Sequence, residues 1–391
     1  MRRHLRLRPG RSTAIALVII AFAAGGIALL DRSGPPEETG PGPGAAFDVT
    51  AALGGEEQAA GYRRVTGPEP LAFPQDHGPH PGYRHEWWYV TGNVTTDGGR
   101  HFGFQATLFR FNIAPEMPAR ASDLATNQLW MAHMAVTDTR AGAFHHRERF
   151  VRGAAGLAGG TARPFRVHAE DWVMRSADSG AMPVELHFPA GDLAIEMRLT
   201  PRKPLVLQGE QGYSRKGPEP GNASRYYSYT RLAAQGRITV AGETHTVSGS
   251  AWMDREWGTS SLGADQEGWD WFALQLEDGR ELMFYRLRRG DGSTSPYSEG
   301  VLVARDGTAE RLGPGQVRLE PQRYWRSPHG GRYPVAWRMQ VPEHDLDLAL
   351  EPVLDYQELD GAFRYWEGAV RVRGRSGPDG RGYAELTGYA Q

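Results

Sequence analysis

One hairpin pattern occurs in both halves of the chain, and this repeat limits the possible folds more than any other feature. In the first copy, the segments 90–94 and 101–110 flank an Asp-Gly turn that is followed by Arg. In the second copy, 269–276 and 281–286 flank the same kind of turn. Asp-Gly between two alternating apolar segments is a strong signal for a tight β-hairpin. The sequence therefore predicts that one β-rich unit is present twice.

Further segments match in the same order along the two halves. The matching pairs are 135–138 with 301–304, the segments around Trp172 and Trp325, 226–228 with 365–367, and 249–252 with 382–385. Short alternating runs separated by turns are typical of all-β domains. An open sheet of so many strands would leave unpaired edges, and closing each sheet into a barrel removes them.

We therefore predict an all-β fold of two tandem antiparallel β-barrels, with the first domain at 62–258 and the second at 259–391. A barrel of about eight strands leaves room inside for side chains or for one small ligand. The aromatic residues of these strands predict a lipophilic small molecule as that ligand. The pattern leaves open which barrel holds it, or whether the two barrels share a site at their interface.

The N-terminal segment 1–32 is typical of an exported protein. Several Arg residues precede an uncharged, mostly apolar run from Ala14 to Leu30, and such a run directs export of the rest of the chain. A cleaved signal peptide and a retained anchor that contacts the membrane both stay open. The segment 33–61 is rich in Pro and Gly and predicts a flexible linker. We expect the body of the protein outside the cytoplasm, in the cell envelope.

Composition and missing motifs exclude several classes of function. The 44 basic and 46 acidic residues nearly balance, which argues against a nucleic-acid partner. The chain has no Cys, so disulfides, thiol catalysis and Cys-ligated zinc are excluded. It has neither the zinc-protease motif HExxH nor the serine-hydrolase motif Gly-x-Ser-x-Gly. Several His residues lie close in sequence and His133 can approach them, but no spacing matches a metal motif; we predict no metal and no cofactor.

Asp254 is the first candidate for catalysis, in the segment Trp252-Met253-Asp254-Arg255-Glu256-Trp257. Protonating a carbon–carbon double bond requires a carboxylic acid that apolar surroundings keep protonated. Aromatic rings beside it would stabilise the resulting carbocation. In the alternative interpretation, Asp254 and Glu256 pair with Arg255 or another Arg and fix the corner between the barrels.

The segment His85-Glu86-Trp87-Trp88-Tyr89 is the second candidate. On a strand, His85, Trp87 and Tyr89 share one face, and Glu86 and Trp88 share the other. His85 could relay a proton to or from the ligand. Alternatively, this strand closes the barrel floor and its Trp pair is part of the core.

Arg110 and Arg286 each follow an aromatic residue at matching positions of the repeat. This favours a structural role, with each Arg stacked on an aromatic ring. Arg110 is also a candidate anchor for a ligand carboxylate. Together with Arg110, we predict these aromatic ligand contacts: Trp87, Trp88, Trp252, Trp257, Trp269 and Trp271.

Several blocks of the chain resemble those of one family over about residues 62–391. The blocks are 83–93, 102–105, 109–110, 252–258 and 382–389. They are similar to the AttH-like lipocalin-like family, which is related to carotenoid 1,2-hydratases and fungal kievitone hydratases. Bacterial members are often described as predicted secreted hydrolases. The resemblance implies two lipocalin-like barrels, in agreement with the repeat.

The resemblance also implies roles for individual residues. In the carotenoid hydratases, an element that resembles Trp252-Met253-Asp254 supplies the acid, and a nearby His assists it. The corresponding segment here, Arg225-Tyr226-Tyr227, has no His. We predict that Tyr226 and Tyr227 act near Asp254, together with Glu256 and His85.

Two functions stay open. One is an enzyme, either a hydro-lyase like the carotenoid 1,2-hydratases or a secreted hydrolase. The other is a non-catalytic protein that binds a lipophilic molecule and assists an ABC-type transporter permease, since some relatives are encoded beside such permeases.

Overall fold

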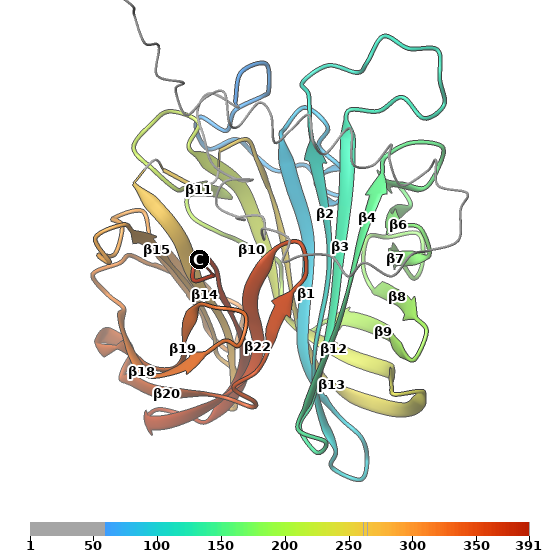
Figure 1. Ribbon diagram of the computed structural model, residues 1–391. Helices are drawn as coiled ribbons and strands as arrows, with labels where there is room; N and C mark the ends of the chain where they lie inside the picture. Colours follow the sequence, from blue (N-terminus) through green and yellow to red (C-terminus); the bar gives the residue numbers. More distant parts are fainter. Residues whose placement is uncertain (1–58, 261, 264, 391) are drawn as a thin grey trace, which may run out of the picture. The chain divides into compact units, whose positions relative to one another are not determined.

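Almost all regular structure in the protein is antiparallel β-strand, which confirms the all-β prediction (Figure 1). The computed structural model describes residues 59–260, 262–263 and 265–390, which belong to one compact unit. The predicted export segment 1–32 lies outside the described residues, as does nearly all of the linker 33–61. In the part of the chain that is described, no helix is long and apolar enough to cross a membrane.

The first sheet contains strands from residues 85–258. In the order of hydrogen-bonded neighbours, these are β4 (Ala143–Arg152), β3 (Gln128–Asp138), β2 (His101–Asn112), β1 (His85–Thr95), β13 (Glu243–Gly258), β12 (Ala223–Val240), β9 (Leu193–Pro201), β8 (Val184–Ala190), β7 (Trp172–Ser176), β6 (Phe165–Ala169) and β5 (Ala158–Ala162). The short strands β10 (Val206–Leu207) and β11 (Tyr213–Arg215) also pair with β12. A 3₁₀ turn, η2 (Gln75–His77), precedes β1.

The second sheet repeats this order with strands from residues 266–386. The neighbours are β17 (Ala309–Leu312), β16 (Glu299–Val303), β15 (Glu281–Arg289), β14 (Gln266–Leu276), β23 (Gly380–Leu386), β22 (Arg364–Ser376), β20 (Leu346–Pro352), β19 (Arg332–Val341) and β18 (Arg318–Arg326). β21 (Glu358–Asp360) also pairs with β22, and the 3₁₀ turn η3 (Pro342–His344) precedes β20.

The order of neighbours identifies the equivalent strands of the two sheets. β1, β2, β3, β7, β12 and β13 hold the same places in the first sheet as β14, β15, β16, β18, β22 and β23 in the second. The segment pairs that match in sequence lie on these equivalent strands. The repeat therefore reflects two similar, curled antiparallel sheets, which form barrel-like halves.

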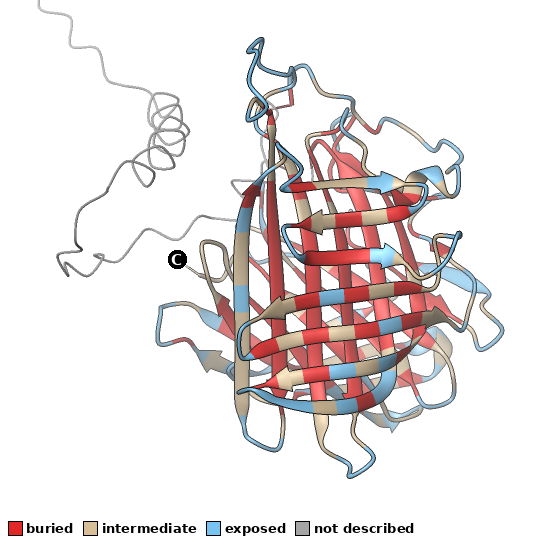
Figure 2. Ribbon diagram, turned by 90° about the vertical axis from the view of Figure 1, so that its right-hand side faces the viewer, coloured by how far each residue is buried: buried red, intermediate tan, exposed pale blue. Residues whose placement is uncertain are grey.

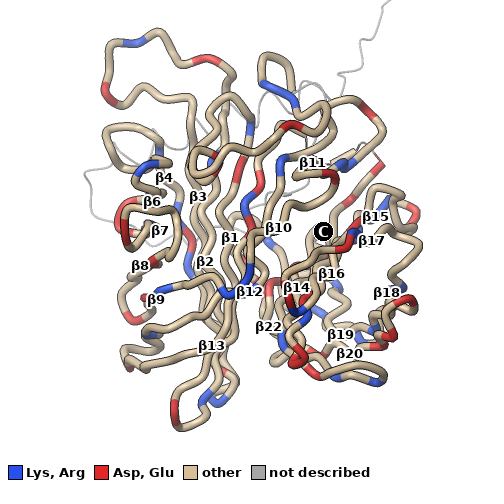
Figure 3. The backbone as a smooth tube through the Cα atoms, turned by 180° about the vertical axis from the view of Figure 1, so that it is seen from behind, with Lys and Arg blue, Asp and Glu red and all other residues tan. Residues whose placement is uncertain are grey.

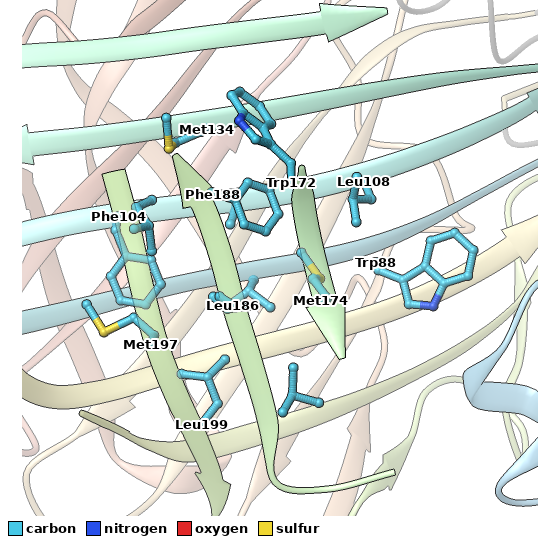
Figure 4. Close-up of a cluster of buried hydrophobic side chains, with 14 of the residues drawn as sticks. Trp88, Phe104, Leu108, Met134, Trp172, Met174, Leu186, Phe188, Met197 and Leu199 are labelled. Carbon is cyan, nitrogen blue, oxygen red and sulfur yellow. The ribbon is translucent and has the colours of Figure 1, made fainter. Parts of the chain in front are cut away.

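Each sheet curls around an apolar interior that its own side chains fill. In the first sheet, Trp172 and Phe188 pack at 5.4 Å between ring centroids, in one cluster with residues of β1, β2 and β3 (Figure 4). The interior of the second sheet is filled around Trp337 and Trp366. Of the two possibilities for a barrel interior, side chains or a ligand, the structure has packed side chains.

Burial differs along the first sheet because only some of its strands face water. β8 and β9 alternate between buried and more exposed residues, whereas β1, β2 and β3 are buried along nearly their whole length (Figure 2). A strand that is buried on both faces must have a second layer against its outer side. That layer is the second sheet.

The outer faces of the two sheets pack against each other. β1 contacts β23, β2 contacts β22 and β12 contacts β14, and β22 lies beside β1 in Figure 1. A separate apolar cluster fills this interface, with Tyr89, Tyr226 and Trp252 from the first sheet and Trp271 and Tyr383 from the second. The interface therefore presents aromatic residues from both copies of the repeat to each other.

Acidic and basic residues are intermixed along the backbone (Figure 3). Inside the protein they form ion pairs at equivalent places. Glu86 on β1 faces Arg110 on β2, and Asp270 on β14 faces Arg286 on β15. All four side chains are largely buried. The duplication has thus kept one buried acid–arginine pair in each sheet.

Candidate functional site

A cavity of about 110 Å³ lies between the two sheets. Most of its lining is aromatic, and both sheets contribute. The aromatic residues are Trp87, Tyr89, Phe109, Phe111, Tyr226, Trp269, Trp271, Tyr285, Phe363 and Tyr365. The other lining residues are Met131, His133, Lys216, Asp254, Glu256, Leu287, Glu385 and Thr387. The cavity thus occupies the interface between the barrels, one of the locations that the sequence left open.

The alternation of β13 brings its acidic residues to the cavity. Asp254 is paired with Tyr89 of β1 and with Ser228 of β12, and Glu256 is paired with Trp87 and Tyr226. Since side chains alternate along a strand, both acids project from the outer face of the first sheet.

Asp254 is buried, with 3% exposure, and three side chains donate hydrogen bonds to it. The Tyr226 hydroxyl donates to Oδ2 at 2.6 Å, and the Ser228 hydroxyl and the Trp252 indole each donate to Oδ1 at 2.6 Å. Burial raises the pKa of Asp254 to about 7, although the three hydrogen bonds favour the ionised form. Such a carboxyl can give or accept a proton near neutral pH.

The alternative role for Asp254, an ion pair with an arginine, does not occur in the structure. Arg255 projects from the opposite face of β13 and pairs with Glu86. Within the described residues, no cation lies at ion-pair distance from Asp254. Glu256, in contrast, has a cation nearby. The Lys216 ammonium lies 3.2 Å from its carboxylate, and Ser224 donates a hydrogen bond to it.

The second sheet supplies the opposite wall, which is built from β14, β15, β22 and β23. The Trp271 indole of β14 donates a 3.2 Å hydrogen bond to the Tyr226 hydroxyl. The Trp269 indole donates a 2.7 Å hydrogen bond to Glu385 of β23. Polar groups of the two sheets are therefore joined across the cavity wall.

His133 completes the polar lining from the first sheet. Its Nδ1 lies 2.7 Å from the Tyr365 hydroxyl of β22, and its Nε2 lies 3.1 Å from Glu148 of β4. Both His133 and Tyr365 border the cavity. The sequence suggested His133 only in connection with a metal, whereas here the ring bridges two sheets.

The structure brings six of the predicted site residues together around the cavity: Asp254, Glu256, Tyr226, Trp87, Trp269 and Trp271. Trp252 stands just behind them. Its indole bonds Asp254, and its ring packs edge-on against Trp271 at 6.4 Å.

The remaining predicted residues do not line the cavity. His85 is buried and stacks on Trp87 at 5.8 Å, and burial together with nearby Arg84 and Arg110 lowers its pKa to about 3. It is therefore neutral at pH 7, and it is not among the residues that line the cavity. Tyr227 projects from the other face of β12, where its hydroxyl lies 2.6 Å from Nδ1 of His77.

Trp88, Trp257 and Arg110 also project away from the cavity. Trp88 lies in the interior of the first sheet and donates a 2.8 Å hydrogen bond to the His77 carbonyl. Trp257 stacks on His80 at 4.0 Å. Arg110 is fully buried against Glu86, so it cannot anchor a ligand in this cavity. Side chains alternate between the two faces of a strand, and each of these three residues is next in sequence to a residue that lines the cavity, so each projects from the opposite face.

Sequence reasoning did not select Glu385, Lys216, Tyr285, His133 and Tyr365 as site residues. Glu385 could have been found from alternation in 382–386, which puts it on the same face as Tyr383. Lys216 lies in a loop, and at the cavity its ammonium lies 3.9 Å from the centre of the Tyr285 ring and 3.2 Å from the Glu256 carboxylate. No local pattern indicates these contacts.

Comparison with known proteins agrees with the resemblance seen in the sequence. The AttH-like family matches residues 64–389. A solved AttH protein from Nitrosomonas europaea is 37% identical, with a TM-score of 0.75 over 84% of this chain and 99% of that chain. No curated protein matches the chain.

Two more distant structures share the fold. Kievitone hydratase from Nectria haematococca is 14% identical, with a TM-score of 0.62 over 83% of this chain and 97% of that chain. CghA, solved with Sch210972, is 13% identical, with a TM-score of 0.52 over 86% of this chain and 98% of that chain. At these identities the likeness shows the fold alone. The family match and the 37% identical structure together show that this chain belongs to the AttH-like family.

Proposed function

We propose that the protein adds water to a carbon–carbon double bond of a lipophilic substrate held between the two sheets, or forms such a bond by removing water. Asp254 is the acid that protonates the double bond in the hydration direction. Water then attacks the carbocation and loses a proton, so that the product carries one new C–H and one new C–O bond.

The observation that carries this proposal is the setting of Asp254. Its carboxyl is buried without a cation at ion-pair distance in the described part of the chain, and its pKa is raised to about 7. A carboxyl that serves only to hold the fold is commonly paired with arginine, as Glu86 is here. Aromatic faces around the cavity would stabilise a cation formed beside Asp254.

Cavity size supports a substrate with one branched alkene unit bound at the site. An apolar cavity of about 150 Å³ holds one benzene molecule, and this cavity is about 110 Å³. Protonation is easiest where it produces a tertiary cation, which favours the trisubstituted double bond of a prenyl group. The name of the structurally similar kievitone hydratase also supports a hydration reaction.

The test uses the full chain with geranylgeraniol, a prenyl alcohol, in water labelled with heavy oxygen. We expect mass spectrometry to find product that contains the label. Asp254→Asn should lower kcat about 100- to 10,000-fold, the usual contribution of a general acid. Glu358→Gln is the matched control, because Glu358 is also buried but is bonded to Ser327 and Tyr333 away from the cavity. Full turnover by Asp254→Asn would refute the proposed acid.

A non-catalytic role in binding a lipophilic molecule is the second candidate, and the largely aromatic lining favours it. In that case, a lipid co-purifies with the protein and is recovered unchanged, and Asp254→Asn binds it as the unmodified protein does. We further propose, from the N-terminal sequence, that the chain is exported to the cell envelope, where a transporter permease is the candidate partner.

A further inference from the structure

Glu367 and Glu385 form a second group of uncompensated carboxyls at the cavity. They are direct cross-strand neighbours on β22 and β23. Glu385 lines the cavity, whereas Glu367 lies behind it with 0% exposure. The Trp269 indole donates to Glu385 at 2.7 Å, and the Tyr89 hydroxyl of the first sheet donates to Glu367 at 2.5 Å.

Neither carboxyl has a cation at ion-pair distance among the described residues. Three other buried acids of this protein do have such a cation. Glu281 pairs with Lys203 and Arg231, Asp270 pairs with Arg286, and Glu86 pairs with two arginines. Two neighbouring carboxyls without a cation oppose each other's ionisation, and Glu367, with 0% exposure, has no contact with water that would stabilise its charge. The pair therefore holds at least one proton near neutral pH.

Glu385 stands on the wall opposite Asp254. Asp254 is on β13 of the first sheet and Glu385 on β23 of the second, and both border the same cavity. Trp271 connects the two positions, since it is the cross-strand neighbour of Glu385 and its indole bonds the Tyr226 hydroxyl that donates to Asp254. A substrate in the cavity would have one carboxyl on each side.

We propose that Glu385 is the proton acceptor of the reaction, with Glu367 as its positioning residue. This inference rests on the proposed function. Asp254 gives its proton to one carbon of the double bond, and a water molecule forms the C–O bond at the other carbon. Glu385 takes the proton that this water loses. The proton then returns to Asp254 through water, which restores both groups.

The electrostatic setting agrees with this role. Burial raises the pKa of Glu385 to about 7 and that of Glu367 well above its ordinary range. Other titratable groups border the same space and must be considered in any pH profile. They are Tyr89, His133, Lys216, Tyr226, Asp254, Glu256, Tyr285 and Tyr365, and Tyr383 lies near Glu367 behind the wall.

The experiment measures kcat and KM for geranylgeraniol against pH in Glu385→Gln, a variant that keeps the shape and the acceptor for Trp269. Because an acceptor must be ionised, the rate of the unmodified protein should fall as the pH drops below about 7. We expect Glu385→Gln to lose this acid limb and about 100-fold or more in kcat, with little change in KM. Glu358→Gln again serves as the control.

Two substitutions test the role of Glu367. If that role were purely structural, both variants would have the same pH profile. Glu367→Gln resembles the protonated side chain and keeps a donor group beside Glu385, its cross-strand neighbour, so it should keep the acid limb. Glu367→Met cannot donate, so it should move the acid limb to higher pH. Equal profiles for the two variants would overturn the role of Glu367.

The outcomes separate this inference from the proposed function. If Asp254→Asn abolishes turnover while Glu385→Gln keeps its rate and pH profile, Glu385 is not the acceptor and the proposed function stands. If Glu385→Gln abolishes turnover and Asp254→Asn does not, the proposed acid is wrong. An infrared titration without substrate gives a further check. A protonated carboxyl band that disappears as the pH rises through about 7 should weaken in Glu385→Gln, and an unchanged band would overturn the inference.

Discussion

The hydroxyl of Tyr226 donates a 2.6 Å hydrogen bond to Oδ2 of Asp254. Trp271 of the second sheet donates in turn to that hydroxyl. A donor to a carboxylate favours its ionised form, so this contact opposes the effect of burial on the pKa of Asp254. The pKa of Asp254 on the first sheet therefore depends on a contact with Trp271 of the second sheet.

Tyr226→Phe should raise the pKa of Asp254 further above about 7, because the carboxylate loses a hydrogen-bond donor. Infrared titration of the carboxyl band should show the midpoint at a higher pH. Tyr227→Phe is the matched control, since Tyr227 lies on the opposite face and bonds His77. A midpoint that moves equally in both variants would contradict the assigned contact.

Asp254→Asn should change how stability depends on pH. Burial raises the pKa of Asp254 from 3.8 to about 7, so the folded state binds this proton more tightly than the unfolded state. Unmodified protein should therefore lose stability as the pH rises from about 4 to about 7, by a maximum of roughly 4 kcal/mol from this group. Urea unfolding at several pH values should show a smaller loss in Asp254→Asn. An identical pH slope in the two proteins would count against the raised pKa.

Glu86→Gln should destabilise the fold by about 3–5 kcal/mol, because it leaves two buried guanidinium groups without a full counter-charge. Burial alone would raise the pKa of Glu86, but Arg255 and Arg110 hold it well below its ordinary value. Stability from this group is complete above the ordinary pKa of Glu, 4.5, and is lost as the pH falls below that value, so urea unfolding should show the same deficit throughout pH 5–8. Glu185→Gln, which breaks exposed pairs with Arg175 and Arg198, should cost less than about 1 kcal/mol.

Gly103→Ala should weaken the docking of the two sheets. A Cβ atom on Gly103 of β2 would lie 2.6 Å from the Cβ of Ala369 on β22, which is far closer than carbon atoms pack. We expect a loss of about 1–3 kcal/mol and a lower Tm. In Gly98→Ala, by contrast, the nearest atom is 3.8 Å away, so stability should be nearly unchanged. Equal Tm values in the two variants would contradict the close approach of β2 and β22.

The fold was predictable because its signals are local and periodic. Asp-Gly turns define the hairpins β1–β2 and β14–β15, and matching segments such as 226–228 and 365–367 identify equivalent strands. Alternation also assigned Trp87 and Trp88 to opposite faces of β1. The packing of the outer faces against each other was not predictable, because that contact joins residues far apart in the chain.

The site was only partly predictable for the same reason. Asp254 stood out from its local setting, but its donors come from β12, and its second wall comes from β14 and β23. Tyr227 and Trp257 were expected at the site from their nearness in sequence, yet they project from the wrong face of their strands. Alternation in 382–386 indicates which face Glu385 shares, but it does not reveal that this face borders the same cavity as Asp254, because that contact joins two different sheets.

Joining two copies in one polypeptide removes a restriction that symmetry would impose on this cavity. A symmetric homodimer of single units would have to present the same residues from both walls. Here Asp254 stands among hydroxyl and indole donors, while Glu385 stands beside another carboxyl. Each wall could therefore diverge on its own, which gives the two faces of a bound molecule different chemical surroundings.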